Sequence, residues 1–224
     1  MIDRNTRNNY ITKYINFVVY CLIFGGLVFL LTPAGIWPSF YSPKFYGILA
    51  LISAGLIILP KYIFRTSHEC KQEAVMFMQL GIATAFLLND IGSLYLYRPE
   101  FTWLQYDKLL HLFSPFYLTV ILVSFLQVWR HFSLKKAVFR SVVIVVLSCF
   151  AWEILEYLSD HFFQTTAFGI NGQYIYFDTT LDLLFDFVGV FIAAIAVESR
   201  EFYQVVVSEY CQGHIQKEAI KKSV

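Results

Sequence analysis

The stretch SVVIVVLSCFAWEILEYL, residues 141–158, decides the fold class, because it is long and apolar enough to cross a lipid bilayer. Crossing the hydrocarbon core takes roughly 20 mostly apolar residues in a helix, whose backbone satisfies its own hydrogen bonds. The same stretch carries two glutamates, Glu153 and Glu156, and carboxylates are costly in hydrocarbon. It therefore predicts a membrane-spanning helix with an acidic face that needs an explanation.

The whole chain has the composition of a membrane protein. Of its 224 residues, 58% are hydrophobic and only 15% are charged, whereas a soluble domain carries about 25% charged residues. Six segments qualify as spans by length and apolarity: 15–32, 45–64, 73–95, 109–129, 138–158 and 180–198. We therefore predict an all-α polytopic membrane protein, a bundle of six transmembrane helices that forms one integral membrane domain over residues 1–224.

The basic residues fall on alternate sides of the predicted spans in unequal numbers. Fourteen of the 17 Lys and Arg residues lie in the N-terminal arm, the second and fourth loops and the tail 199–224. Cytoplasmic loops accumulate Lys and Arg. The sequence therefore predicts that both termini, including the tail 199–224, are cytoplasmic.

The acidic residues concentrate on the opposite, non-cytoplasmic side, where four predicted helices begin or end. They repeat at helical spacing, as in the stripe Asp178, Asp182 and Asp186, so each helix presents one polar face. Polar faces turned toward lipid would be costly, so they should turn toward each other. We predict one common cavity, open to the outer side and lined by the candidate site residues Asp107, His111, Glu153, Glu156, Asp182 and Asp186, with Asp90 and Asp178 at its rim.

Carboxylates packed together repel one another unless protons are shared or a cation intervenes. Carboxylates with one imidazole suit Mg²⁺, Mn²⁺ or Fe²⁺ better than Zn²⁺. The candidate ligands for such a divalent metal are Asp107, His111, Glu153 and Asp182. Without a metal, Lys108 or Arg98 must neutralise part of the cluster, or several of the acids must be protonated.

Three motifs follow one another in the second half of the chain: YDKLLH (106–111), WEILEY (152–157) and DTTLDLLFDFVG (178–189). Their order resembles two bacterial membrane-protein families, the VanZ-like family and the family typified by the inner-membrane protein YjdF. The YjdF-type pattern is the closer one, because both glutamates are present, although Trp152 precedes Glu153 instead of following Glu156. The resemblance covers roughly residues 89–195 and implies a protein of the bacterial inner (plasma) membrane with a role at the cell envelope.

Three functional hypotheses remain open. In the first, the cluster is a divalent-metal or acid/base site that acts on a lipid or lipid-linked envelope substrate at the outer leaflet. In the second, it is a structural polar knot that orients the helices of a scaffold or binding protein. The third is a small cation or proton transporter, against which the lack of a second ionisable layer counts. We expect membrane lipids as partners and no nucleic acid, and a partial cover over the cluster formed by the loop 159–179.

Overall fold

The computed structural model describes residues 4–37, 42–92, 105–163 and 175–198. Within these ranges the chain is helical and each of six helices is long and apolar enough to cross a membrane, which confirms the predicted six-span all-α architecture. The helices are α1 (Arg4–Leu31), α2 (Pro43–Ile63), α3 (Glu69–Ile91), α4 (Tyr106–Arg130), α5 (Leu134–Phe163) and α6 (Ile175–Ala196), with a short 3₁₀ turn, η1, at Ala34–Ile36.

The helices differ in length from the predicted spans. The first begins at Arg4 instead of residue 15, and α5 covers Leu134–Phe163 instead of 138–158. Hydropathy detects the length that suits hydrocarbon, whereas helical hydrogen bonding continues into the interfacial region where polar side chains are stable. Helix α5 therefore continues beyond Glu153 and Glu156 to Phe163.

The same extension shortens the loop that was predicted over residues 159–179. Its first part, 159–163, belongs to α5, and its last part, 175–179, belongs to α6. The prediction of a loop over the whole range is therefore wrong at both ends. The remaining segment, 164–174, and the tail 199–224 lie outside the described residues.

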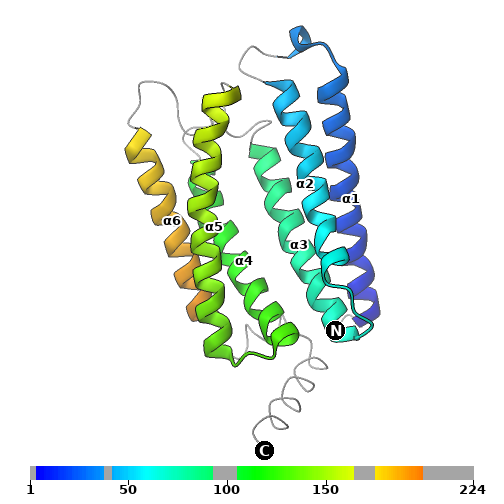
Figure 1. Ribbon diagram of the computed structural model, residues 1–224, viewed down its shortest axis with the longest axis vertical. Coiled ribbons are helices and arrows are strands. Elements are labelled where there is room, and N and C mark those ends of the chain that lie inside the picture. The colour runs from blue at the N-terminus through cyan, green and yellow to red at the C-terminus, as the bar shows by residue number, and fades with distance from the viewer. Residues whose placement is uncertain (1–3, 38–41, 93–104, 164–174, 199–224) are drawn as a thin grey trace, which may run out of the picture.

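The six helices form two groups of three (Figure 1). Helices α1, α2 and α3 pack together in one half, and α4, α5 and α6 pack together in the other. The halves join chiefly where α3 packs against α4, so α4 contacts helices of both groups. This position makes α4 the central helix and places His111, on one of its buried faces, inside the second half.

Glycine allows the closest approach between two helices of the second half. A Cβ atom added to Gly189 of α6 would lie 2.2 Å from the carbonyl oxygen of Leu112 in α4. Such a distance is far inside van der Waals contact with a backbone atom, so a larger residue could enter only if the helices moved apart. Gly189 therefore fixes how near α6 lies to the part of α4 that carries His111.

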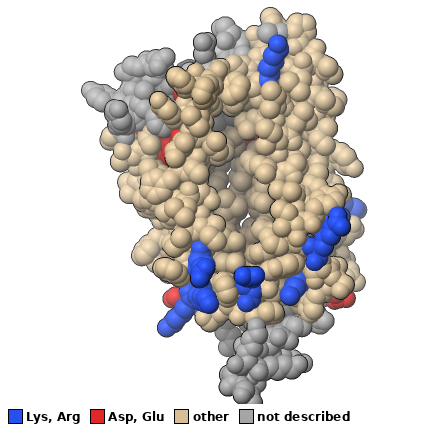
Figure 2. Space-filling model, in the orientation of Figure 1, with Lys and Arg blue, Asp and Glu red and all other residues tan. Residues whose placement is uncertain are grey.

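The charges divide between the two ends of the bundle. Figure 2 shows that Lys and Arg side chains gather at one end, where α1, α3 and α5 begin, in agreement with the uneven distribution of basic residues along the sequence. We call this the basic end. The other, where α4 and α6 begin and α5 ends, is called the cluster end. The orientation of the two ends in the membrane stays a prediction.

Candidate functional site

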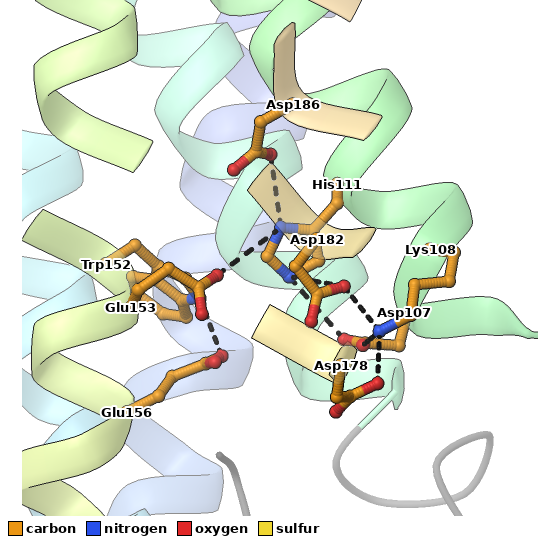
Figure 3. Close-up of polar contacts among 9 residues, drawn as sticks. All are labelled: Asp107, Lys108, His111, Trp152, Glu153, Glu156, Asp178, Asp182 and Asp186. Carbon is orange, nitrogen blue, oxygen red and sulfur yellow. Dashed lines mark hydrogen bonds and ion pairs between the residues drawn. The ribbon is translucent and has the colours of Figure 1, made fainter. Parts of the chain in front are cut away.

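The site is a cluster of polar side chains from α4, α5 and α6 at the cluster end (Figure 3). It contains six carboxylates, one lysine, one histidine and one tryptophan, namely Asp107, Lys108, His111, Trp152, Glu153, Glu156, Asp178, Asp182 and Asp186. The six predicted lining residues and one of the two predicted rim residues are all in this group. Their common location supports the predicted convergence of polar faces.

One part of the cluster, which we call the lysine half, is organised around Lys108. Its ammonium nitrogen Nζ donates hydrogen bonds to Asp107 Oδ2 at 3.0 Å, Asp178 Oδ1 at 2.7 Å and Asp182 Oδ1 at 2.5 Å. The three carboxylates come from two helices, so one cation ties the start of α4 to the start of α6. Of the two neutralising residues that the sequence offered, Lys108 takes this position, and Arg98 lies outside the described residues.

The other part, the histidine half, is organised around His111. The imidazole Nδ1 lies 3.1 Å from Asp186 Oδ1 and 3.9 Å from Glu153 Oε1. Its other nitrogen, Nε2, lies 3.7 Å from an oxygen of Asp107 and 3.7 Å from one of Asp182. His111 therefore faces carboxylates with both ring nitrogens and connects the two halves of the cluster.

Exposure decreases from the lysine half to the histidine half. The side chains of Asp107 and Asp178 are 39% and 44% exposed, whereas those of Glu153 and Asp186 are 7% and 4% exposed. Asp107 and Asp178 are therefore the more exposed members of the cluster, which agrees with a rim position for Asp178.

Glu153 is the member of the cluster whose carboxylate has a buried oxygen without a hydrogen bond. Its Oε1 atom is buried and has no hydrogen-bond partner among the described residues. A buried carboxylate oxygen that makes no hydrogen bond carries a desolvation cost of several kcal/mol unless a charge or a ligand offsets it. This oxygen points toward His111 and the neighbouring carboxylate of Asp186 (Figure 3). It can therefore still bind a cation or accept a hydrogen bond.

Two backbone features position His111. Pro115, four residues further along α4, has no N–H, so the carbonyl of His111 loses its usual partner in the helical ladder. One turn beyond Asp186, Gly189 lets α6 approach the backbone of α4 at Leu112. Together these features bring the imidazole and the Asp186 carboxylate to hydrogen-bonding distance.

Glu156 lies beside the histidine half and is partly exposed. The indole Nε1 of Trp152 donates a 2.7 Å hydrogen bond to Glu156 Oε1 across one turn of α5. This role of Trp152 is not among the predictions from the sequence, although its spacing of four residues from Glu156 indicates it. Among the described residues no hydrogen bond or ion pair joins Asp90, on α3, to the cluster, and its place at the rim stays a prediction.

The histidine half has the donor set of a divalent-cation site. Atoms of His111, Glu153 and Asp186 all lie within 4.8 Å of one another, and atoms of Asp107, His111 and Asp182 meet the same condition. Ligands at 2.0–2.6 Å from one ion are at most about 5 Å apart, so both triads fit such an ion in size. In the second triad, Asp107 and Asp182 already bind the Lys108 ammonium group. The first triad, which includes Asp186 in place of two of the predicted ligands, is the better candidate.

The match to known families covers most of the chain. A model of predicted membrane proteins, the family DUF2238, matches residues 16–201, a range that contains the whole cluster. The chain belongs to this family. No curated protein and no solved structure matches it. Membership in DUF2238 confirms an integral membrane protein, and the likeness to YjdF-type and VanZ-like proteins stays a resemblance.

Proposed function

We propose that this DUF2238 protein binds a divalent cation in the histidine half and acts on the phosphate group of a lipid or lipid-linked substrate at the outer leaflet. The observation that carries the proposal is the buried, hydrogen-bond-free Oε1 atom of Glu153, which points at His111 and Asp186. Bound there, Mg²⁺ or Mn²⁺ would supply a Lewis acid that withdraws negative charge from phosphoryl oxygens.

The protein's own residues have separate roles in this proposal. His111, Glu153 and Asp186 hold the cation, and Lys108 keeps Asp107 and Asp182 in place beside it. Asp107 is the exposed carboxylate nearest to the Nε2 atom of His111, at 3.7 Å, and is placed to accept a proton from a group that enters through the rim. These roles correspond to metal binding, positioning and general-base catalysis.

The distribution of charge along the helices favours a site over a transport path. Beyond the cluster, the buried stripes of α5 and α6 continue as apolar or small residues such as Cys149, Val145, Val190 and Ala193. Between the cluster and the basic end, the described parts of α4, α5 and α6 carry no charged residue until Arg130 and Arg140. A path for cations or protons would need ionisable or hydrated groups across that depth.

A structural polar knot is the second candidate function, and the bonding of Lys108 favours it. This single ammonium group satisfies three carboxylates from two helices without any further ligand. In that case the cluster would fix α4 against α6 in a scaffold or binding protein and would need no substrate.

The experiment that separates these candidates measures turnover and stability together. The purified protein is incubated with mixed vesicles of phosphatidylglycerol, phosphatidylethanolamine and a long-chain polyprenyl diphosphate, and released phosphate and headgroup are quantified with Mg²⁺, with Mn²⁺ and with EDTA. The proposal predicts release that EDTA abolishes, that returned cation restores, and that Asp186→Asn eliminates while the protein stays folded. Folded wild-type protein that releases nothing, together with a loss of thermal stability in the variant, would favour the polar knot.

A further inference from the structure

A crevice separates the two halves of the bundle along one side. Helix α5 packs mainly on α4 and α6, while α2 packs on α1 and α3, so α5 and α2 face each other across the seam between α3 and α4. Figure 2 shows the space-filling surface hollowed between the two halves. We call this space the lateral crevice. Because it lies along membrane-spanning helices, the surrounding solvent is lipid.

The lateral crevice is closed at the cluster end by contacts between α2 and α5. The rings of Phe45 and Phe163 have their centroids 4.9 Å apart. Beside them, the hydroxyl group of Ser42 donates a 3.2 Å hydrogen bond to the carbonyl oxygen of Phe163. These contacts join the two halves at the cluster end, so access to the crevice is sideways, from the bilayer.

The side of α5 that faces this crevice carries Trp152 and Glu156. Both lie on the same side of the helix as Phe163, at offsets of eleven and seven residues. Since Phe163 contacts α2, this side faces α2 across the crevice. Glu153 lies on a neighbouring side, toward His111. Glu156 thus stands between the lateral crevice and the buried cluster, where its Oε1 atom accepts the hydrogen bond from the indole of Trp152.

The negative charge of the cluster indicates which charged group the headgroup of a lipid in the crevice would carry. Six carboxylates face one lysine and one histidine, so the site stays acidic even with a divalent cation bound. A carboxylate at the edge of such a site is complementary to an ammonium group. An anionic headgroup without an ammonium group would instead meet net repulsion.

We propose that the lateral crevice admits one zwitterionic lipid from the bilayer, with a hydrocarbon chain between α5 and α2 and an ammonium headgroup at Glu156. The role of this lipid as a substrate rests on the proposed function, because its phosphate would lie toward the histidine half. Its binding as a ligand depends only on the lateral crevice and Glu156. The lipid is therefore an aminophospholipid, such as phosphatidylethanolamine.

Trp152 provides a fluorescent reporter inside the crevice. The chain has four tryptophans, and the variant with Trp37→Phe, Trp103→Phe and Trp129→Phe retains Trp152 alone. This variant is reconstituted in phosphatidylglycerol vesicles that contain a minor fraction of lipid brominated on its acyl chains, either phosphatidylethanolamine or phosphatidylglycerol. Bromine quenches tryptophan fluorescence only at close range. Quenching stronger than the mole fraction of brominated lipid in the vesicle predicts therefore measures how far that lipid is enriched beside Trp152.

We expect about tenfold enrichment of brominated phosphatidylethanolamine over brominated phosphatidylglycerol. A hydrogen bond from the ammonium headgroup to the charged carboxylate of Glu156 provides a preference of about this size. Glu156→Gln should reduce this preference to near unity, whereas Asp160→Asn, one turn further along α5, should preserve it. Equal quenching by the two lipids, or a preference that survives Glu156→Gln, would overturn the inference. Mn²⁺ binding measured on the same samples tests the proposed function separately, since the lipid preference needs no metal.

Discussion

At the scale of single residues, Lys108 and Glu153 are opposites within one cluster. Lys108 is a partly buried cation whose hydrogen bonds go to three carboxylates, whereas Glu153 is a buried acid with an oxygen that makes none. A buried ion pair that loses one partner is strongly destabilised, because the remaining charge is left without compensation. We therefore expect a substitution of Lys108 to change stability and a substitution of Glu153 to change ligand binding.

Replacing Lys108 with alanine should destabilise the metal-free protein by up to roughly 3 kcal/mol, chiefly because the buried carboxylate of Asp182 loses its cation, while Asp107 and Asp178 are exposed enough for water to compensate them. Thermal unfolding in detergent measures the loss, and millimolar Mg²⁺ should recover part of it by taking the vacated position. Lys44→Ala is the matched control, since Lys44 is exposed at the same end. Equal midpoints for the two variants would show that the lysine half contributes nothing to stability.

The variant Glu153→Gln should unfold at the same temperature as the wild type, or higher, when both are free of metal. It removes a buried negative charge and leaves a neutral amide in nearly the same volume. Added Mn²⁺ should then raise the unfolding temperature of the wild type and leave that of the variant unchanged. A variant that unfolds much earlier without metal would assign Glu153 to the structural knot instead.

Spacing in the sequence predicted much of this cluster. His111, Asp182 and Asp186 were found because residues four apart share a helix face and charges avoid lipid. The separation into two halves could not be predicted, because it depends on which carboxylates Lys108 reaches across helices.

At the scale of helices, the contact between α4 and α6 sets the geometry of the site. Gly189 and Leu112 determine how closely the two helices approach, one turn from Asp186. The last motif ends in Gly189, but the sequence does not show that the backbone of Leu112 lies against this glycine. The helix ends were less predictable, because α1 and α5 continue as helices beyond their apolar spans.

The variant Gly189→Ala should cost roughly 1–3 kcal/mol, because its Cβ would overlap the carbonyl oxygen of Leu112 and push α6 away from α4. Thermal unfolding detects the cost. Gly55→Ala is the control, because a Cβ there has nothing within 4 Å, and it should be neutral or slightly stabilising. If Gly189→Ala matched the control, the close approach of the two helices would be wrong.

At the scale of the whole molecule, the two ends carry opposite charge. Lys and Arg gather at the basic end, while six carboxylates converge at the cluster end (Figures 2 and 3). The positive-inside rule predicts that the basic end lies in the cytoplasm and that the cluster faces outward. The proposed substrate, a lipid of the outer leaflet, depends on this orientation.

Site-directed cysteine labelling tests the orientation. A cysteine at Ser133, in the short turn between α4 and α5, should react with a membrane-impermeant maleimide only after the cells are opened. The background is a cysteine-free variant, and a second cysteine at Ser42, next to α2 at the cluster end, should react in intact cells. Labelling of position 133 from outside would reverse the topology and with it the proposed outer-leaflet substrate.

Binding of Mn²⁺ to the purified protein tests the central claim most directly. Electron paramagnetic resonance distinguishes free from bound Mn²⁺, so a titration gives both stoichiometry and affinity. We predict one bound ion per chain in the wild type and in Asp160→Asn, and at least about tenfold weaker binding in Asp186→Asn and Glu153→Gln, since each loses a charged ligand. Wild-type protein that binds no Mn²⁺, or variants that bind it as tightly as the wild type, would contradict the assignment of the histidine half as a metal site.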